Sequence, residues 1–250
     1  MLKLNKTTNF WCLLVDNELI NLKYLEDRKG YHEMIYIVGL GAGDESQLTL
    51  GVVAKLKSGL PLFLRTAEHP MINFLNENGI EYRAFDDVYM KHETFEAVYE
   101  EIIETIKEEA KKGDLIYATP GHPCVAEYAV KRLVAETEAV ILGGQSFLDP
   151  MFAALAIDPI EGLQVMDALD FDYEAIAPKQ HLIVPQVFDQ LVASNLKLDL
   201  MEVYDDEYEV CIVKAAGSNI AELKWVKLYE LDHNFKLDNL TTIYVPPLKG

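Results

Sequence analysis

Residues 36–44 read Tyr36-Ile37-Val38-Gly39-Leu40-Gly41-Ala42-Gly43-Asp44. An apolar strand runs directly into three alternating glycines and an aspartate, and a helix-like segment follows. Glycine has no Cβ, so such a turn lets main-chain N–H groups and a helix N-terminus approach a small ligand closely. The dinucleotide fingerprint G-x-G-x-x-G has a different spacing, because Gly39, Gly41 and Gly43 are two residues apart each time. Taken alone, the motif also fits an ordinary tight turn.

Charge and cysteine content narrow the possible function classes. The 250 residues carry 22 basic and 41 acidic side chains, a formal net charge of −19. Binding to nucleic acid or to an anionic membrane needs a basic surface, so neither is an expected partner. Cys12, Cys124 and Cys211 form no C-x-x-C pair, which favours a reducing, cytoplasmic location and neither disulfides nor a zinc site. No apolar run reaches the ~18 residues that span a bilayer.

The first 33 residues differ from the rest of the chain. They are rich in Asn, Lys and Leu and show no clear period, whereas the first strong strand begins at Ile35, directly after Met34. We interpret residues 1–33 as an extension upstream of a native start at Met34. The alternative is a genuine, partly ordered N-terminal arm, and N-terminal sequencing of the native protein separates the two.

From Met34 onward, expected strands and helices alternate. Continuous apolar strands separated by helices indicate a parallel sheet that is covered on both faces. The clearest helix is 94–112, with an apolar stripe formed by Phe95, Val98, Ile102, Ile103, Ile106 and Ala110. The other expected elements are strands at 35–38, 60–64, 81–85, 115–118 and 139–142, and helices at 45–58, 70–78 and 125–135.

The chain changes character at about Asp158. Residues 208–214 favour pairing with an antiparallel neighbour, so we expect a mixed sheet in this half. Its expected elements are strands at 164–166, 181–184, 201–204, 210–214 and 241–245, and a helix at 187–198. We therefore predict an α/β protein of two α/β domains, 34–157 with a parallel sheet and 158–246 with a mixed sheet. A ligand cleft between them is the expected site, and 247–250 begins a linker.

Two further glycine turns follow expected strands. Thr119-Pro120-Gly121-His122-Pro123 comes after the strand 115–118, and Leu142-Gly143-Gly144-Gln145-Ser146-Phe147 comes after the strand 139–142. Open parallel α/β sheets bind their ligands at the carboxyl ends of the strands. Three glycine turns at the ends of parallel strands therefore predict one small-molecule site more strongly than any single turn does.

From Met34 to its end, the chain resembles the tetrapyrrole methylases, methyltransferases that use S-adenosylmethionine. The family pattern V-G-x-G-x-G-D followed by L-T is matched by Val38–Asp44 with Leu48-Thr49. Pro120–Pro123 stands where the family has G-G-D-P, and Gly143–Ser146 stands where it has P-G-x-[ST]. Within the family the chain looks closest to the methylase half of fusion proteins that carry a MazG-type nucleoside triphosphate pyrophosphohydrolase. That subgroup reads P-G-H-P in the middle loop and resembles this chain at 228–231 and 240–247.

The resemblance implies a cofactor folded into the cleft between two domains, usually in a homodimer. Carried over residue by residue, the implied S-adenosylmethionine contacts are Gly39, Gly41, Ala42, Gly43, Asp44, Gly121, His122, Val125, Ser146, Phe147, Gln186 and Val226. Several of these depart from the family pattern: Ala42 replaces proline, His122 an acid, Phe147 a small residue and Gln186 a methionine. Cofactor binding is therefore the firmer expectation and efficient methyl transfer the weaker one, and no catalytic base is identified.

The run Glu100-Glu101-Ile102-Ile103-Glu104 matches E-E-x-x-E, the first metal-binding motif of MazG-type enzymes. No second motif E-x-x-D follows on a plausible partner helix. The glutamates also lie opposite the apolar stripe of helix 94–112, so we interpret them as a solvated face.

Two functions remain open. The first is an S-adenosylmethionine-dependent methyltransferase that acts on a small, tetrapyrrole-like substrate. The second is a cofactor-binding regulatory or dimerising module for a MazG-type pyrophosphohydrolase domain or partner. A nicotinamide enzyme is disfavoured by the glycine spacing and because the second strand ends in Arg65, not near the acid that a Rossmann site needs.

Overall fold

The computed structural model describes residues 12–15, 18–21, 33–233 and 235–248. It divides into an N-terminal domain, residues 45–145 with the chain up to Gly41, and a C-terminal domain, residues 146–250 with 42–44. Strands β1 (Cys12–Val15) and β2 (Glu18–Asn21) pair antiparallel. Most of the segment 1–33 lies outside the described residues, so the interpretation of that segment as an extension stays a prediction.

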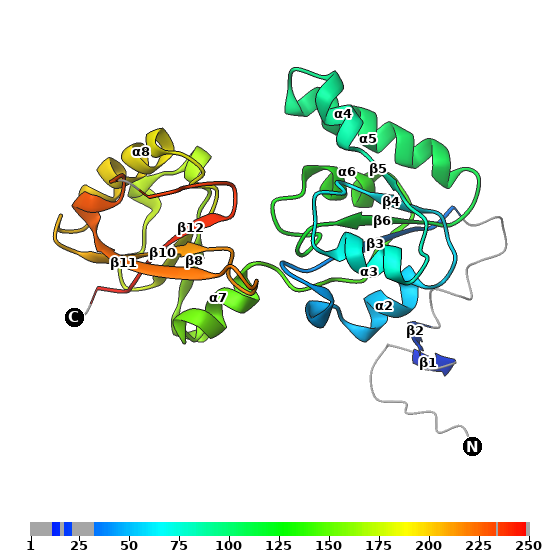
Figure 1. Cartoon of the computed structure of the whole chain (residues 1–250), viewed down its shortest axis with the longest axis horizontal. Helices are drawn as coiled ribbons and strands as arrows, with labels where there is room; N and C mark the ends of the chain where they lie inside the picture. The colour runs from blue at the N-terminus through cyan, green and yellow to red at the C-terminus, as the bar shows by residue number, and fades with distance from the viewer. Residues whose placement is uncertain (1–11, 16–17, 22–32, 234, 249–250) are drawn as a thin grey trace. The chain divides into compact units, whose positions relative to one another are not determined.

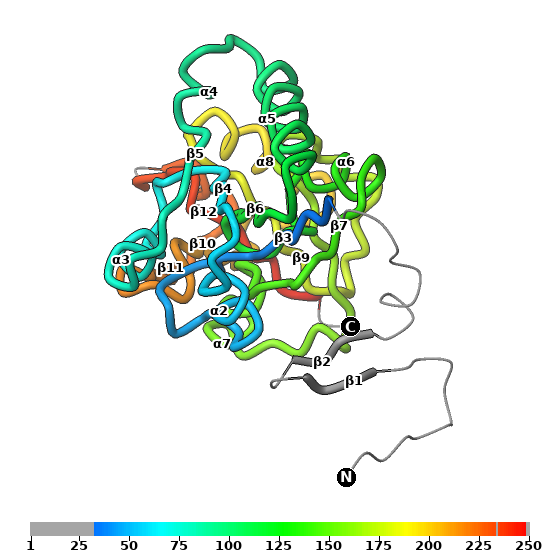
Figure 2. The backbone as a smooth tube through the Cα atoms, turned by 90° about the vertical axis from the view of Figure 1, so that its right-hand side faces the viewer, coloured from blue at the N-terminus to red at the C-terminus, as the bar shows by residue number. Residues whose placement is uncertain are grey.

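The N-terminal domain is built on a five-stranded parallel sheet, as expected. Figure 2 shows its strands in the order β5-β4-β6-β3-β7, and every pairing between them is parallel. The strands are β3 (Ile35–Gly39), β4 (Leu62–Leu64), β5 (Arg83–Ala84), β6 (Leu115–Thr119) and β7 (Ala139–Ile141). All residues of β4 and β6 are buried, which explains their unbroken apolar sequence.

Helices cover both faces of this sheet (Figure 1). One face packs with α4 (Asp86–Lys91), α5 (Phe95–Ala110) and α6 (Tyr128–Glu136). The other packs with α2 (Leu50–Leu56) and α3 (Met71–Glu77). The predicted stripe of α5 is buried except at Phe95, which is 67% exposed. Phe95 is the first helical residue and stacks on Tyr99 instead, so the prediction was wrong there.

Local capping moves two helix starts away from their predicted positions. A 3-10 turn, Glu45–Gln47, precedes α2, which begins only at Leu50 because the Thr49 side chain accepts the Val52 N–H. Helix α6 begins at Tyr128, because Val125 N–H closes a turn onto the His122 carbonyl and Ala126 adopts a left-handed φ of 55°. The first glycine turn is therefore not followed directly by a helix N-terminus.

The C-terminal domain has a mixed sheet, also as expected. The strand order is β11-β10-β12-β9-β8; β8 and β9 are parallel, and the other pairs are antiparallel. The strands are β8 (Leu163–Val165), β9 (His181–Val184), β10 (Glu209–Lys214), β11 (Glu222–Lys227) and β12 (Thr241–Val245). Helix α8 (Gln190–Met201) covers one face and α7 (Leu148–Leu155) the other (Figure 1).

The predicted strand at 201–204 is wrong. Met201 is the last residue of α8, and Tyr204 N–H bonds back to the Leu200 carbonyl, so this segment continues the helical turn. Short 3-10 turns occur at Pro159–Glu161, Ala168–Asp170, Tyr173–Ala175 and Leu228–Glu230. Among the described helices, none combines the length and apolar content that crossing a bilayer requires.

Candidate functional site

Three loops of the N-terminal domain meet at the carboxyl edge of its sheet. They follow β3, β6 and β7, which are neighbours in the sheet. Gly39 N–H donates to the Gly143 carbonyl (2.7 Å), while Gly41 and Gly121 exchange two hydrogen bonds, 3.2 and 2.8 Å. The expectation that the glycine turns gather at one edge of the parallel sheet is confirmed within this domain.

Two of the glycines are required by the packing of these loops against one another. A Cβ on Gly39 would lie 2.3 Å from the Gly121 carbonyl oxygen and 2.9 Å from that of Gly143. A Cβ on Gly144 would lie 2.7 Å from the Gly39 Cα. The N–H groups of Gly39 and Gly41 are used between loops. Glycine is thus required at position 39 by the packing of the loops against one another, and not by the close approach of a ligand.

Gly121 has different surroundings. Its φ is +64°, a left-handed conformation that favours glycine, and nothing lies within 4 Å of the position that its Cβ would take. Gly143 also has a left-handed φ, +76°, and its Cβ would lie 3.6 Å from His122 Nε2. Of these loop glycines, Gly121 is therefore the one whose backbone faces open space and can meet a ligand at close range.

His122 organises its own loop. Its Nδ1 accepts the Cys124 N–H (3.0 Å), and its carbonyl accepts the Val125 N–H (2.9 Å). Because Nδ1 is an acceptor here, a neutral His122 carries its proton on Nε2. This geometry agrees with a loop histidine that hydrogen-bonds the backbone, the interpretation that we favour over a catalytic base.

The other predicted contacts group with the C-terminal domain. Ser146 N–H and Oγ both bond Asp149, and Ser146 Oγ accepts the Leu148 N–H at the start of α7. Val226 is buried in β11 opposite Val210. The remaining members are half-buried Phe147, buried Gly43, exposed Asp44, half-buried Ala42, and Gln186.

Gln186 stands out among them for its backbone. It has a φ of +67°, and its side-chain amide donates to Asp167 (2.8 Å). A left-handed conformation is costly for a residue with a side chain, and such positions cluster at functional sites. The contact of Gln186 with the cofactor stays a prediction.

His69 is a residue of this edge that the sequence interpretation missed. It follows β4, its Nδ1 accepts the Met71 N–H (3.2 Å), and its Nε2 lies 3.0 Å from the Gly41 carbonyl. Nε2–H therefore donates to Gly41, and the ring is neutral. Burial lowers the pKa of His69, against the hydrogen bond to Gly41. The available sequence signal was the polar run that follows an apolar strand at the same sheet edge.

Replacing His69 by Ala should destabilise the N-terminal domain by about 1 kcal/mol, the usual net contribution of a hydrogen bond. Because the folded-state pKa is lowered, this contribution is present above the ordinary histidine pKa and is lost as the pH falls below it. Thermal unfolding of H69A across this pH range, with exposed His233→Ala as the control, measures it. Identical melting curves for H69A and the wild type at neutral pH would contradict the assignment.

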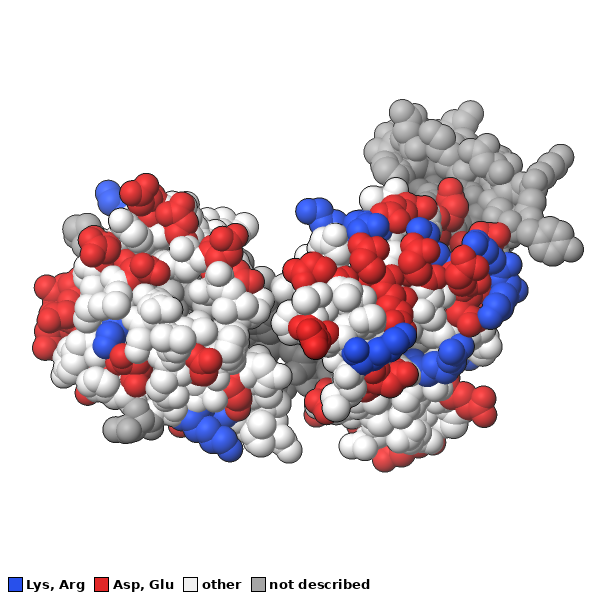
Figure 3. Space-filling view, turned by 90° about the horizontal axis from the view of Figure 1, so that it is seen from above, with Lys and Arg blue, Asp and Glu red and all other residues white. Residues whose placement is uncertain are grey.

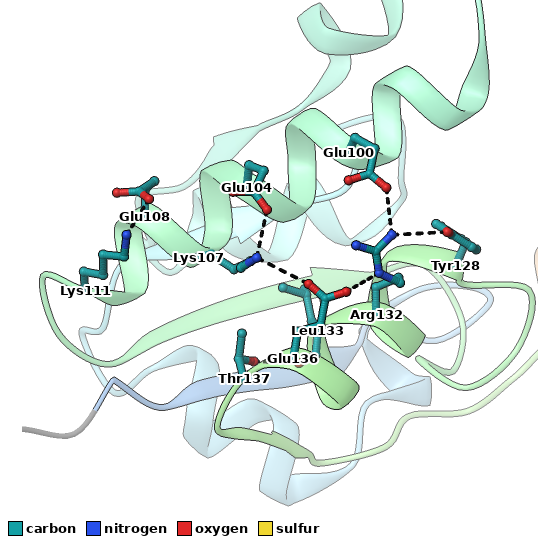
Figure 4. A network of polar contacts seen from close by, with 10 residues as sticks. All are labelled: Glu100, Glu104, Lys107, Glu108, Lys111, Tyr128, Arg132, Leu133, Glu136 and Thr137. Carbon is teal, nitrogen blue, oxygen red and sulfur yellow. Dashed lines mark hydrogen bonds and ion pairs between the residues drawn. The ribbon is translucent and has the colours of Figure 1, made fainter.

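Two of the three glutamates of the E-E-x-x-E match, Glu100 and Glu104, lie in a network of ion pairs on α5 and α6 (Figure 4). Each of the three has a cationic partner: Glu100 with Arg132 (2.7 Å), Glu101 with Lys91 (2.7 Å) and Glu104 with Lys107 (2.8 Å). Glu136 on α6 bonds both Arg132 and Lys107 and so links the two helices. On the face of this domain seen in Figure 3, acidic and basic side chains lie side by side. The arrangement is that of a solvated, ion-paired helix face.

A bacterial relative matches most of the chain. The Bacillus subtilis (strain 168) protein, "Uncharacterized protein YabN", is 49% identical over 220 residues, which is 86% of this chain and 45% of that protein. The chain thus spans less than half the length of that relative.

Solved structures of methyltransferases share the fold. Cobalt precorrin-4 methyltransferase CbiF has a TM-score of 0.66 and 14% sequence identity, and the match covers 86% of this chain and 95% of that one. Archaeoglobus fulgidus precorrin-6Y methylase CbiE has a TM-score of 0.63 and 20% identity, with 87% of this chain and 100% of that one covered. The methyltransferase CobJ has a TM-score of 0.65 and 17% identity, with 88% of this chain and 95% of that one covered. The sequence profile described as "Tetrapyrrole (Corrin/Porphyrin) Methylases" matches residues 34–232. The match covers well over half of the chain, which therefore belongs to the tetrapyrrole methylase family.

Proposed function

We propose that this protein is an S-adenosylmethionine-dependent methyltransferase that acts on a small, tetrapyrrole-like acceptor. The observation that carries the proposal is the glycine-lined carboxyl edge of the parallel sheet in this member of the family. There, Gly39 and Gly144 allow the loops to pack together, and Gly121 faces open space. Open α/β sheets bind their ligands at this edge. The finer proposal, closeness to MazG-type fusion proteins, rests on the P-G-H-P loop at Pro120–Pro123 and on the resemblance at 228–231 and 240–247.

The loop geometry fits a cofactor that needs close backbone contact. S-adenosylmethionine supplies an already activated methyl group, so the protein's share is to bind, orient and exclude water. Gly121 offers a backbone with no side chain in the way, and His122 and His69 hold the second and first loops in shape. The residues proposed to contact the cofactor in the N-terminal domain are Gly41, Gly121, His122 and Val125, while Gly39 holds the loops together.

Calorimetric titration tests cofactor binding. S-adenosylmethionine should bind and NADH should not. Gly121→Val should lower the affinity for S-adenosylmethionine about tenfold to hundredfold, because it fills the open side of the loop. Gly79→Val is the matched control: Gly79 has the same φ of +64° and the same empty surroundings, but follows α3. Equal loss of affinity in both variants, or no binding by the wild type, would refute the proposal.

A competing role is a cofactor-binding module with little methyl transfer of its own, serving a MazG-type pyrophosphohydrolase. One observation favours it, namely that the matched relative is more than twice as long as the matched part. Mass-spectrometric detection of S-adenosylhomocysteine after incubation with cell extract distinguishes the two. Production that depends on an intact Gly121 supports the methyltransferase, whereas binding without turnover supports the module.

A further inference from the structure

A buried ion pair lies at the same sheet edge, next to the glycine loops. Arg65 directly follows β4, and its N–H bonds the Ala118 carbonyl of β6 (2.9 Å). Its guanidinium contacts Glu127 Oε1 through Nη1 (3.0 Å) and donates to the Tyr89 hydroxyl through Nε (3.0 Å). The Glu127 side chain is 3% exposed and that of Arg65 is 26% exposed. The Glu127 side chain is therefore shielded from solvent, whereas the Arg65 side chain is partly exposed.

The backbone is distorted to place Glu127 there. Ala126 has a left-handed φ of 55°, a conformation that costs free energy in a residue with a Cβ. Glu127 also occupies the N-cap position of α6, yet its side chain makes no capping bond and reaches Arg65 instead. Both features would be unnecessary if Glu127 served only to begin the helix.

The cluster contains hydrogen-bond donors that no described residue is shown to use. The Tyr117 hydroxyl is fully buried and has no hydrogen-bond partner among the described residues. It lies within electrostatic reach of Glu127 and Arg65. The Tyr89 oxygen accepts from Arg65, so its own hydrogen is left to donate. No described residue is shown to accept from Arg65 Nη2. Solvent can accept from the exposed part of Arg65, but the buried Tyr117 hydroxyl requires an acceptor that the described residues do not provide.

The charges of the cluster favour an exchangeable anion. Burial raises the pKa of Glu127 to about 7, although Arg65 acts in the opposite direction. Burial lowers the pKa of Arg65, but Glu127 and Tyr89 raise it above its ordinary value, so Arg65 stays charged. The other titratable groups facing the pair are Tyr89 of α4, Tyr99 of α5 and Tyr117 of β6. Arg65 is thus a fixed cation beside a carboxylate that readily becomes neutral.

We propose that Arg65, Tyr89 and Tyr117 bind an oxyanion, a carboxylate or phosphate group of the methyl acceptor, and that Glu127 releases Arg65 and takes up a proton when this ligand binds. A planar guanidinium matches the two oxygens of either group. A second carboxylate or a phosphate beside Glu127 disfavours its charged form, so a proton enters with the ligand. Only the identification of the ligand with the acceptor rests on the proposed function.

Isothermal titration with pyrophosphate and with citrate tests the site and separates phosphate from carboxylate recognition. At least one probe should bind the wild type. If the ligand binds only when Glu127 is protonated, its affinity falls about tenfold between pH 6 and pH 8. Titrations in buffers of different ionisation enthalpy should show proton uptake at pH 8. Binding that is independent of pH, or no binding of either probe at millimolar concentration, overturns the proposal.

Substitutions in the cluster test whether the probes bind at this site. Arg65→Met should weaken binding about tenfold or more, and Tyr117→Phe by a smaller factor. Glu127→Gln should bind tightly at both pH values and take up no proton. Arg83→Met is the matched control, because Arg83 forms an exposed ion pair with Glu109 in the same domain. Where Arg65→Met does not fold, Arg65→Lys keeps the charge but loses the planar fork and should still weaken binding. Unchanged affinity for the probes in the Arg65 and Tyr117 variants refutes the oxyanion site. The titration with S-adenosylmethionine tests the proposed function independently of this result.

Discussion

Gly39→Ala should destabilise the N-terminal domain by about 3 kcal/mol or more, at the upper end of the range for overpacked buried sites. The added methyl group would lie 2.3 Å from one backbone oxygen and 2.9 Å from another, and backbone atoms cannot rotate away as a flexible side chain can. The loops that carry these oxygens follow β6 and β7, which pair with β3 on its two sides. The loops must therefore separate, which removes the Gly39–Gly143 hydrogen bond as well.

The measurement is thermal unfolding, where a loss of this size lowers the melting temperature by about 6–12 °C for a chain of this length. Gly144→Ala should act in the same direction, because its Cβ would meet Gly39 and Gly121. Gly51→Ala is the control: Gly51 lies in α2 with nothing within 4 Å, so alanine should be neutral or slightly stabilising. A Gly39→Ala protein that melts with the wild type would show that the three loops are not packed together.

Much of the carboxyl edge of the N-terminal sheet could be predicted from local sequence, because the residues that form each strand and turn are also the ones that mark it in the sequence. An unbroken apolar run becomes a buried parallel strand, and the glycine that ends it marks a turn where a side chain does not fit. Both signals are present at Val38-Gly39 and at Ala118 to Gly121. What the sequence did not reveal is the role of each glycine. The clash at Gly39 is with oxygens 82 and 104 residues away along the chain.

The residues that were missed act through contacts distant in sequence. His69 reaches Gly41 across 28 positions, and Arg65 reaches Glu127 across 62. No pattern in the intervening sequence predicts either contact. The helix starts were missed for a local reason: Thr49 caps α2 with its side chain, and Ala126 takes a left-handed conformation before α6. Periodicity extends a helix as far as apolar spacing permits, whereas caps decide where it begins.

Glu127→Gln should raise stability by less than about 1 kcal/mol at pH 5, just above the unfolded-state pKa, and by up to about 3 kcal/mol above pH 8. The pKa of Glu127 rises from 4.5 to about 7 on folding, chiefly through burial. The folded protein therefore holds this proton more tightly than the unfolded chain does. Its stability falls as the pH rises from the unfolded to the folded pKa and is constant above that window. The amide of the variant resembles the protonated carboxyl group at every pH, so the two proteins differ only where Glu127 is ionised.

Chemical denaturation of both proteins at the two pH values gives the difference directly, because the other groups titrate alike in each. The control is Glu109→Gln, in a pair with Arg83 and Lys112 at the surface. Hydrogen bonding to Lys112, assisted by Arg83 and opposed by burial, lowers the pKa of Glu109, so this variant should lose stability at high pH, the opposite sign. Equal free energies for Glu127→Gln and the wild type at both pH values would mean that Arg65 fully compensates the buried carboxylate. Glu127 would then remain charged when a ligand approached Arg65, and an oxyanion there would meet a fixed negative charge, not a carboxyl group ready to accept a proton.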